Sequence, residues 1–127
     1  MYQMIDRFNY PKVSQIVVKE FLDSLRKGKF RIPICLKCDL KIWPPANICS
    51  NCYSGKIRMS ELDPRGRLIE HSSSYIDSTE KLGLVEISGI RIIGILNEGN
   101  LNPGSAVILT KCGLDKDNSP YYEFSAA

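Results

Sequence analysis

The sequence lacks any long apolar run. Its most apolar segment, residues 90–96, is interrupted by Arg91 and Gly94, whereas a membrane-spanning helix needs about 20 apolar residues in succession. The first residues include Asp6 and Arg7 and show no apolar core of a signal peptide. We therefore expect a cytoplasmic protein without a membrane span.

The sequence is also poor in the residues of catalytic sites. His71 is the single histidine among 127 residues, and no nucleophile and orienting acid accompany it in the pattern that a catalytic triad requires. No phosphate-binding loop of the P-loop or Gly-x-Gly-x-x-Gly type is present. An independent enzyme is therefore the least favoured of the functions considered below.

Charge is unevenly distributed along the chain. The net charge of +3 combines residues 1–60, which hold 11 basic and 4 acidic residues, with residues 61–127, which hold 6 basic and 10 acidic residues. A positive first half suits an anionic ligand or an acidic partner surface, although a solvated basic face would give the same composition.

Four of the five cysteines form two Cys-x-x-Cys pairs. The spacing is Cys35-x2-Cys38-x10-Cys49-x2-Cys52, and two such knuckles that face each other supply the four sulfurs of a closed structural zinc site. Iron in a rubredoxin-like site is the main rival, because both metals take a tetrahedron of sulfurs. Metal binding should be coupled to folding, because so small a segment has little core of its own. Cys112, which stands alone in a strand pattern, is expected to be a buried free thiol.

Periodicity predicts a helix at residues 13–27 that ends at Gly28. One face of this helix carries an apolar stripe, which consists of Val17, Val18, Phe21, Leu22 and Leu25. The sequence does not show whether this chain or another protein covers that stripe.

The second half of the chain has the pattern of a small β-barrel. Five short β-rich segments alternate with turn residues, which fits a five-stranded OB-fold. The predicted strands are residues 66–75, 82–88, 90–96, 106–111 and 121–124, with shorter β-like pieces at 29–34 and 56–60. We expect a mainly β protein with three parts: an N-terminal helical segment at 1–28, a rubredoxin-like zinc ribbon at 29–60 and an OB-fold barrel at 61–127.

The order of these motifs resembles a known family. The motifs are the helix stop Gly28-Lys29-Phe30, the two cysteine pairs, Trp43-Pro44-Pro45-Ala46 between them, and the barrel entry Pro64-Arg65-Gly66-Arg67. Together they resemble the zinc-ribbon/OB-fold accessory proteins associated with acyl-CoA enzymes, long known as a domain of unknown function. The sequence departs from the family pattern at four positions. Asp39 and Tyr53 replace a glycine after each cysteine pair, Ala46 replaces an arginine, and Pro64 replaces a glycine.

The resemblance implies a non-catalytic accessory subunit that binds acyl-CoA and acts as a scaffold in a thiolase-type acyl-CoA enzyme complex. It implies a thiolase-like or hydroxymethylglutaryl-CoA synthase-like partner, CoA or acyl-CoA as ligand, and a place in the mevalonate pathway. CoA is an anion with a long apolar arm, so the basic first half is compatible with this role. The candidate ligand residues are Lys41, Trp43, Arg65 and Arg67.

Nucleic-acid binding is the alternative, because zinc ribbons and OB-folds both occur in proteins that bind nucleic acids. OB-folds of that kind stack bases on aromatic side chains of their second and third strands. Residues 82–96, which supply those strands here, contain no Phe, Tyr or Trp. The sequence therefore favours the accessory role.

Overall fold

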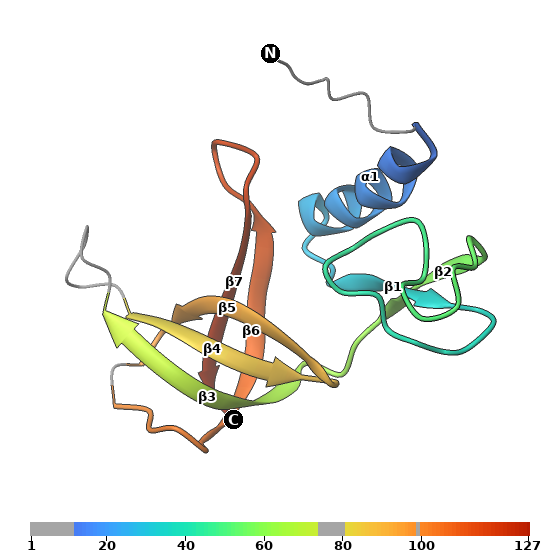
Figure 1. Ribbon diagram of the computed structural model, residues 1–127. Coiled ribbons are helices and arrows are strands. Elements are labelled where there is room, and N and C mark those ends of the chain that lie inside the picture. The colour runs from blue at the N-terminus through green and yellow to red at the C-terminus, as the bar shows by residue number, and fades with distance from the viewer. Residues whose placement is uncertain (1–11, 74–80, 99) are drawn as a thin grey trace, which may run out of the picture.

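The computed structural model describes residues 12–73, 81–98 and 100–127. Within these ranges a helix and a two-stranded ribbon lie beside a closed barrel (Figure 1). The elements are α1 (Lys12–Arg26), β1 (Arg31–Cys35), β2 (Ile57–Glu61), β3 (Arg65–Ser73), β4 (Lys81–Ile87), β5 (Ile90–Leu96), β6 (Ala106–Leu114) and β7 (Pro120–Ala126). The predicted fold class, mainly β with a zinc ribbon and a five-stranded barrel, is confirmed.

Helix α1 ends where the sequence predicts. Gly28 adopts a φ of 75°, which L-residues rarely accept, and its N–H donates to the carbonyl of Leu25 at 2.8 Å. Phe21 and Leu25 are buried against β1 and β6. The C-terminal half of the helix therefore packs on its own chain. This part of the apolar stripe is covered by the same protein and not by a partner. Val18, one turn earlier, remains 37% exposed.

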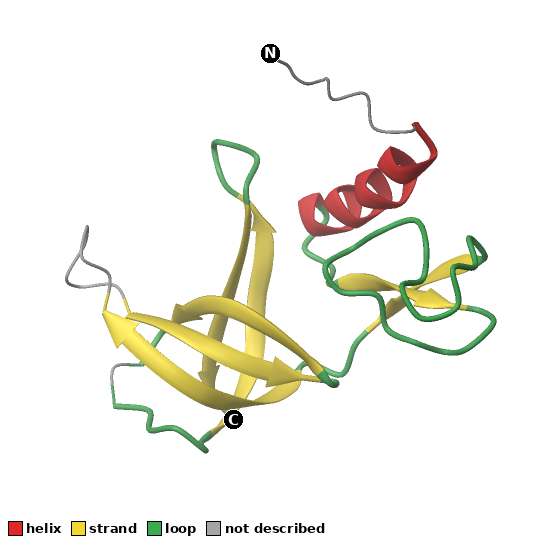
Figure 2. Cartoon of the chain, in the orientation of Figure 1, coloured by secondary structure: helices red, strands yellow, loops and turns green. Residues whose placement is uncertain are grey.

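The ribbon is an antiparallel pair in which Cys35 of β1 lies opposite Ile57 of β2. The chain between these strands returns along β1, because Lys41 forms a bridge with Ile34 and the N–H of Ile42 donates to the carbonyl of Pro33 at 2.9 Å. Figure 2 shows that most of this intervening segment is loop. A stretch with so little regular structure needs another source of order, which the cysteines supply.

The barrel closes in the order β3-β4-β5-β7-β6. Its neighbouring strands are antiparallel except β5 and β7, which pair in parallel at Ile95↔Glu123 and Leu96↔Phe124. Residues pointing inward alternate with outward ones, as in Val85, Ile87, Ile92 and Leu96 on β4 and β5. Phe124 fills the centre and reaches the backbone of Gly94, where a Cβ would lie only 2.6 Å from its ring.

Four aromatic rings connect the helix, the ribbon and the barrel. Phe30, in the link after α1, stacks edge-on against Phe21 of the helix, Trp43 of the ribbon and Tyr122 of β7, with centroid distances of 6.4, 5.9 and 5.3 Å. One hydrophobic cluster accordingly runs through all three parts. The division at residues 28 and 60 into separate units stays a prediction.

Several strand boundaries differ from expectation, most of all in the last two strands of the barrel. The last barrel strands are longer than predicted, since β6 continues to Leu114 and β7 begins at Pro120. A register shift between Leu109 and Lys111 breaks the alternation on which the sequence pattern depends. The end of the predicted strand 66–75 lies outside the described residues. No helix in the described ranges combines the length and apolarity that crossing a membrane demands; the cytoplasmic location stays a prediction.

Candidate metal centre

The four cysteines of the two pairs converge. Their sulfurs all lie within 4.8 Å of one another, and two pairs, Cys35–Cys52 and Cys38–Cys49, are 3.5 Å apart. With zinc–sulfur bonds of about 2.3 Å, a regular tetrahedron places its sulfurs about 3.8 Å apart. The arrangement thus fits one tetrahedral ion, whereas a disulfide would need a sulfur–sulfur distance of about 2.0 Å.

The two knuckles have the same backbone construction. In the first, the N–H of Asp39 donates to the carbonyl of Cys35 at 2.9 Å, and in the second the N–H of Tyr53 donates to the carbonyl of Cys49 at 2.8 Å. Asp39 and Tyr53 adopt φ angles of 61° and 60°, which is the left-handed region that favours glycine. Glycine would adopt this conformation without strain at both positions, and the structure shows that the knuckle forms without it.

Hydrogen bonds and the neighbouring sulfurs shift the pKa values of two of the thiols. Hydrogen bonds from the backbone N–H of Leu40 and the side chain of Asn51 lower the pKa of Cys38 to about 7. The backbone N–H of Ser54 also favours the thiolate of Cys52, but burial and the three neighbouring sulfurs outweigh it and raise the pKa of Cys52 to about 11. Sulfurs this close cannot all become thiolates unless a cation compensates their charge.

The surroundings close the site on its inner side. Cys35 and Cys49 are buried, and Ile42 is buried with them in a small cluster of its own. Cys38 and Cys52 are partly exposed. Four sulfur ligands complete a tetrahedron and leave no open position for a catalytic water. The centre therefore has the character of a structural site.

The comparisons with known proteins decide the nature of this segment. Residues 22–58 match the family model described as ChsH2, rubredoxin-like zinc ribbon domain. This segment is similar to a zinc ribbon in sequence as well as in geometry. The zinc predicted from the cysteine spacing is confirmed as the cofactor that such a ribbon holds, and the resemblance inferred from the motifs is confirmed for the ribbon.

Solved structures extend the likeness from the ribbon to the barrel. One match is a structure named Ltp2-ChsH2(DUF35) aldolase, with a TM-score of 0.70 and 17% identity over 85% of this chain and 92% of that chain. Another is a DUF35-family protein of unknown function from Sulfolobus solfataricus, with a TM-score of 0.64 and 17% identity over 95% of this chain and 90% of that chain. At this identity the likeness shows the fold. No protein with curated annotation matches the sequence.

The four candidate ligand residues lie in two different parts of the molecule. Lys41 is exposed on the ribbon, and Trp43 packs its ring against Phe21 and Phe30. On β3, Arg65 is held by the Asp63 carboxylate at 2.7 Å, and Arg67 donates to the carbonyl of Gly104 at 3.2 Å. These contacts position Trp43 and Arg65 within the fold; ligand binding by the four residues stays a prediction.

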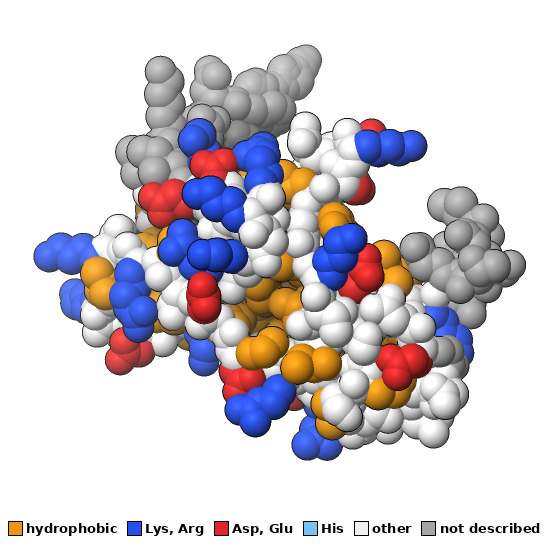
Figure 3. Space-filling view, turned by 180° about the vertical axis from the view of Figure 1, so that it is seen from behind, with side chains coloured by type: hydrophobic (Ala, Val, Ile, Leu, Met, Phe, Trp, Pro, Cys, Tyr) orange, Lys and Arg blue, Asp and Glu red, His pale blue; other side chains and the backbone are white. Residues whose placement is uncertain are grey.

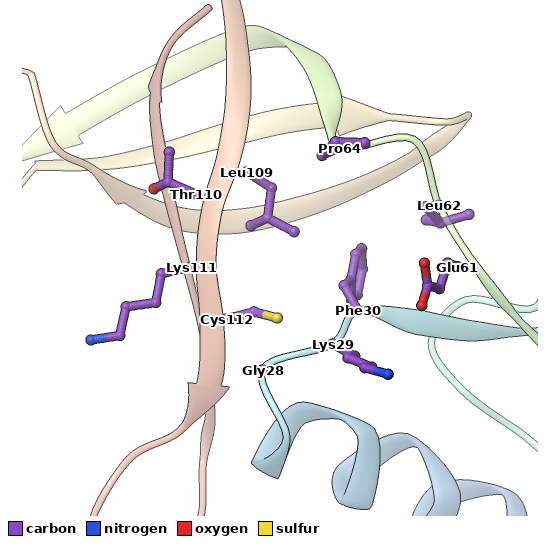
Figure 4. Close-up of a pocket in the computed structure, with 10 residues that line it drawn as sticks. All are labelled: Gly28, Lys29, Phe30, Glu61, Leu62, Pro64, Leu109, Thr110, Lys111 and Cys112. Carbon is purple, nitrogen blue, oxygen red and sulfur yellow. The ribbon is translucent and has the colours of Figure 1, made fainter.

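Sequence reasoning did not find a cavity of about 270 Å³ at the junction of the three parts (Figure 4). The cavity lies between the helix stop, the link from β2 to β3, and β6. Figure 4 shows the sulfur of Cys112 pointing across it toward the ring of Phe30. The expectation that Cys112 is a buried free thiol is confirmed. The lining comprises Gly28, Lys29, Phe30, Glu61, Leu62, Pro64, Leu109, Thr110, Lys111 and Cys112.

Proposed function

We propose that this chain is a non-catalytic, acyl-CoA-binding accessory subunit that acts as a scaffold for a thiolase-type acyl-CoA enzyme. The observation that carries the proposal is the shared two-part structure, a zinc ribbon with a barrel, over 85% of this chain and 92% of the chain from the structure named Ltp2-ChsH2(DUF35) aldolase. That name joins a DUF35 protein to a second protein in an aldolase. A chain of the same construction is suited to the same kind of association.

The chemistry of the described residues supports an accessory role. The four-sulfur site binds its metal without an open position, and His71 is exposed on β3. Burial raises the pKa of Cys112, so its thiol stays protonated at neutral pH and is a poor nucleophile. The reacting groups would then belong to the partner enzyme.

The junction cavity is the proposed place for the apolar part of the ligand. Phe30, Leu62 and Leu109 give it an apolar lining, and Lys29 at its border is exposed. Its volume of about 270 Å³ lies just below the roughly 300 Å³ at which small-molecule pockets begin. It would therefore take an acyl group or part of a pantetheine arm, while phosphates bind to exposed cations such as Lys41.

The outer face of β4 and β5 argues against nucleic-acid binding. Its cross-strand pairs are Leu84↔Ile93 and Leu82↔Ile95, and Ile93 is 64% exposed. Aliphatic side chains offer no ring on which a base can stack. A nucleic-acid ligand would thus lack its usual contacts on the face where OB-folds bind it.

The test is to purify the tagged chain with its bound proteins and identify the partner and the metal together. We expect one zinc per chain, a carbon–carbon-bond-forming or -cleaving acyl-CoA enzyme, and no turnover of acetoacetyl-CoA by the isolated chain. Lys41→Gln should weaken binding of acetoacetyl-CoA to the complex about fivefold, and Lys116→Gln, on the β6–β7 turn, should leave it unchanged. Polyuridylate binding with a steep salt dependence, or turnover by the isolated chain, would overturn the proposal.

A further inference from the structure

The segments beside the metal-centre cysteines expose four large apolar side chains. Leu36, Leu40, Ile48 and Tyr53 are 55, 38, 51 and 79% exposed, and they are four of the six large hydrophobic side chains exposed among the described residues. Each lies within two positions of a cysteine of the metal centre. Because the four sulfurs are within 4.8 Å of one another, all four side chains are attached to backbone close to the same metal centre. We call them the ribbon patch.

Tyr53 combines an exposed side chain with an unfavourable backbone conformation. Its φ of 60° is unfavourable for any side chain with a Cβ, and a glycine there would relieve the strain. The ring gains little inside the molecule in return, since 79% of the residue faces solvent. A bulky residue in a strained and unpacked position is typical of a site with a function outside the fold.

The ribbon patch lies in a basic surround. Lys37, Lys56 and Arg58 are exposed, and none of them forms an ion pair with the residues that the structure describes. Asp39 is the single acidic residue between positions 29 and 60. Figure 3 shows Lys and Arg side chains gathered over the part of the molecule formed by the helix and the ribbon.

We propose that the ribbon patch is the docking surface for a partner protein whose complementary face has an apolar centre surrounded by Asp and Glu side chains. A few well-packed side chains near the centre of an interface, tyrosine among the commonest of them, supply most of its affinity, and opposite charge at the rim supplies orientation and rate. The inference rests on the proposed function and deepens it, since it names the face by which the partner enzyme is held.

The observations favour a partner protein of this kind over a second copy of the chain and over a nucleic acid. A second copy of the chain would bring the same cations face to face, and like charges across an interface oppose association. A nucleic acid would satisfy the cations and could stack a base on Tyr53, but Leu36, Leu40 and Ile48 offer no ring for stacking and would stay exposed to water.

The first test places a photocrosslinker in the ribbon patch. Tyr53→p-benzoylphenylalanine keeps an aromatic ring at this position, and the same substitution at Ile93, which is 64% exposed on the barrel, is the control. After irradiation of cells that produce the full chain, we expect a crosslinked protein at position 53 and little at position 93. Mass spectrometry should map the crosslink to an apolar residue with carboxylates around it. Crosslinks to RNA, to a second copy, or equally from both positions would overturn the inference.

The second test measures affinity with the purified partner. Leu36→Ser and Ile48→Ser should each weaken binding at least tenfold, and Lys37→Glu should weaken it with a reduced salt dependence. Ile93→Ser and Lys116→Glu should stay within twofold of the parent chain. Zinc content and thermal unfolding of each variant show whether the ribbon remains folded.

The outcomes separate this inference from the proposed function. If an acyl-CoA enzyme binds and the ribbon-patch variants do not weaken it, the docking surface is wrong and the function stands. If the variants abolish binding of a protein that does not process acyl-CoA, the docking surface stands and the function is wrong.

Discussion

Replacing Tyr53 with glycine tests the reasoning about strain in the knuckles. The φ of 60° at this position costs a residue with a Cβ about 1–2 kcal/mol. Glycine removes that cost but adds roughly 0.5–1 kcal/mol of backbone entropy to be lost on folding. Because Tyr53 is 79% exposed, the lost ring forfeits little burial. We therefore expect Tyr53→Gly to raise the free energy of unfolding of the zinc-loaded protein by about 0.5–1 kcal/mol.

The measurement is thermal and chemical unfolding at saturating zinc. For a domain of this size the gain corresponds to a rise in Tm of about 2–4 °C. Ser50→Gly, in the same knuckle and with an ordinary φ, carries only the entropic cost and should lower the Tm. Asp39→Gly should gain less than Tyr53→Gly, because aspartate tolerates the left-handed region better than tyrosine. If Tyr53→Gly lowers the Tm as Ser50→Gly does, the strain is absent and the argument fails.

The same variant has a second consequence. If the ribbon patch holds the partner, Tyr53→Gly should be more stable and bind more weakly, since its most exposed aromatic contact is removed. Opposite changes in stability and affinity would be the pattern of a residue kept for function at the expense of the fold. A variant that gained stability and kept its affinity would place Tyr53 outside the docking surface.

Three further predictions concern the fold. Chelation of zinc should unfold the ribbon, and zinc affinity should fall at low pH because the thiols must lose their protons to bind it. Gly94→Ala should cost about 1–3 kcal/mol on denaturant unfolding, because its Cβ would lie 2.6 Å from a core ring, whereas Gly55→Ala should stay within about 0.5 kcal/mol of the parent. Hydrogen bonds from Arg65 lower the pKa of Asp63 to about 2; the stabilisation is therefore present above the unfolded pKa of about 3.9 and is lost as the pH falls through about 2. Arg65→Met should return the pKa of Asp63, measured by NMR titration, toward its ordinary value.

The sequence predicts the local elements well because their patterns are local. The helix was expected at 13–27 and is found at Lys12–Arg26, and β5 has the expected bounds. Periodicity does not show which part of the structure packs against the apolar face of a helix. It marked Val18 and Phe21 alike as apolar stripe, yet only Phe21 is buried, because the covering surfaces come from β1 and β6 and are distant in sequence.

The metal centre was also predictable from a local pattern, whereas the junction cavity and the ring cluster were not. Cysteine spacing alone restricts the geometry of the ligands, so four residues sufficed to predict it. The junction cavity requires residues from three separated segments, which no local pattern connects. Trp43 joins the ring cluster, a set of contacts that no local pattern shows, and its place on a ligand surface stays a prediction.

Zinc and the four rings would have separate tasks in the proposed scaffold. A zinc ion bound by the four cysteines would fix the ribbon patch, because its side chains are attached to the two knuckles that carry these sulfurs. The ring of Phe30 fixes the ribbon relative to the barrel, because it contacts the helix, Trp43 and Tyr122. Phe30→Ala should cost about 3–5 kcal/mol and, if the chain still folds, leave one zinc per chain and an intact ribbon patch. It should then bind the partner through that patch but lose the fixed placement of the junction cavity, which Phe30 also lines. Retained partner affinity with weakened acyl-CoA binding would show that the scaffold depends on this orientation, whereas equal loss of both would show that the ribbon and the barrel fold only together.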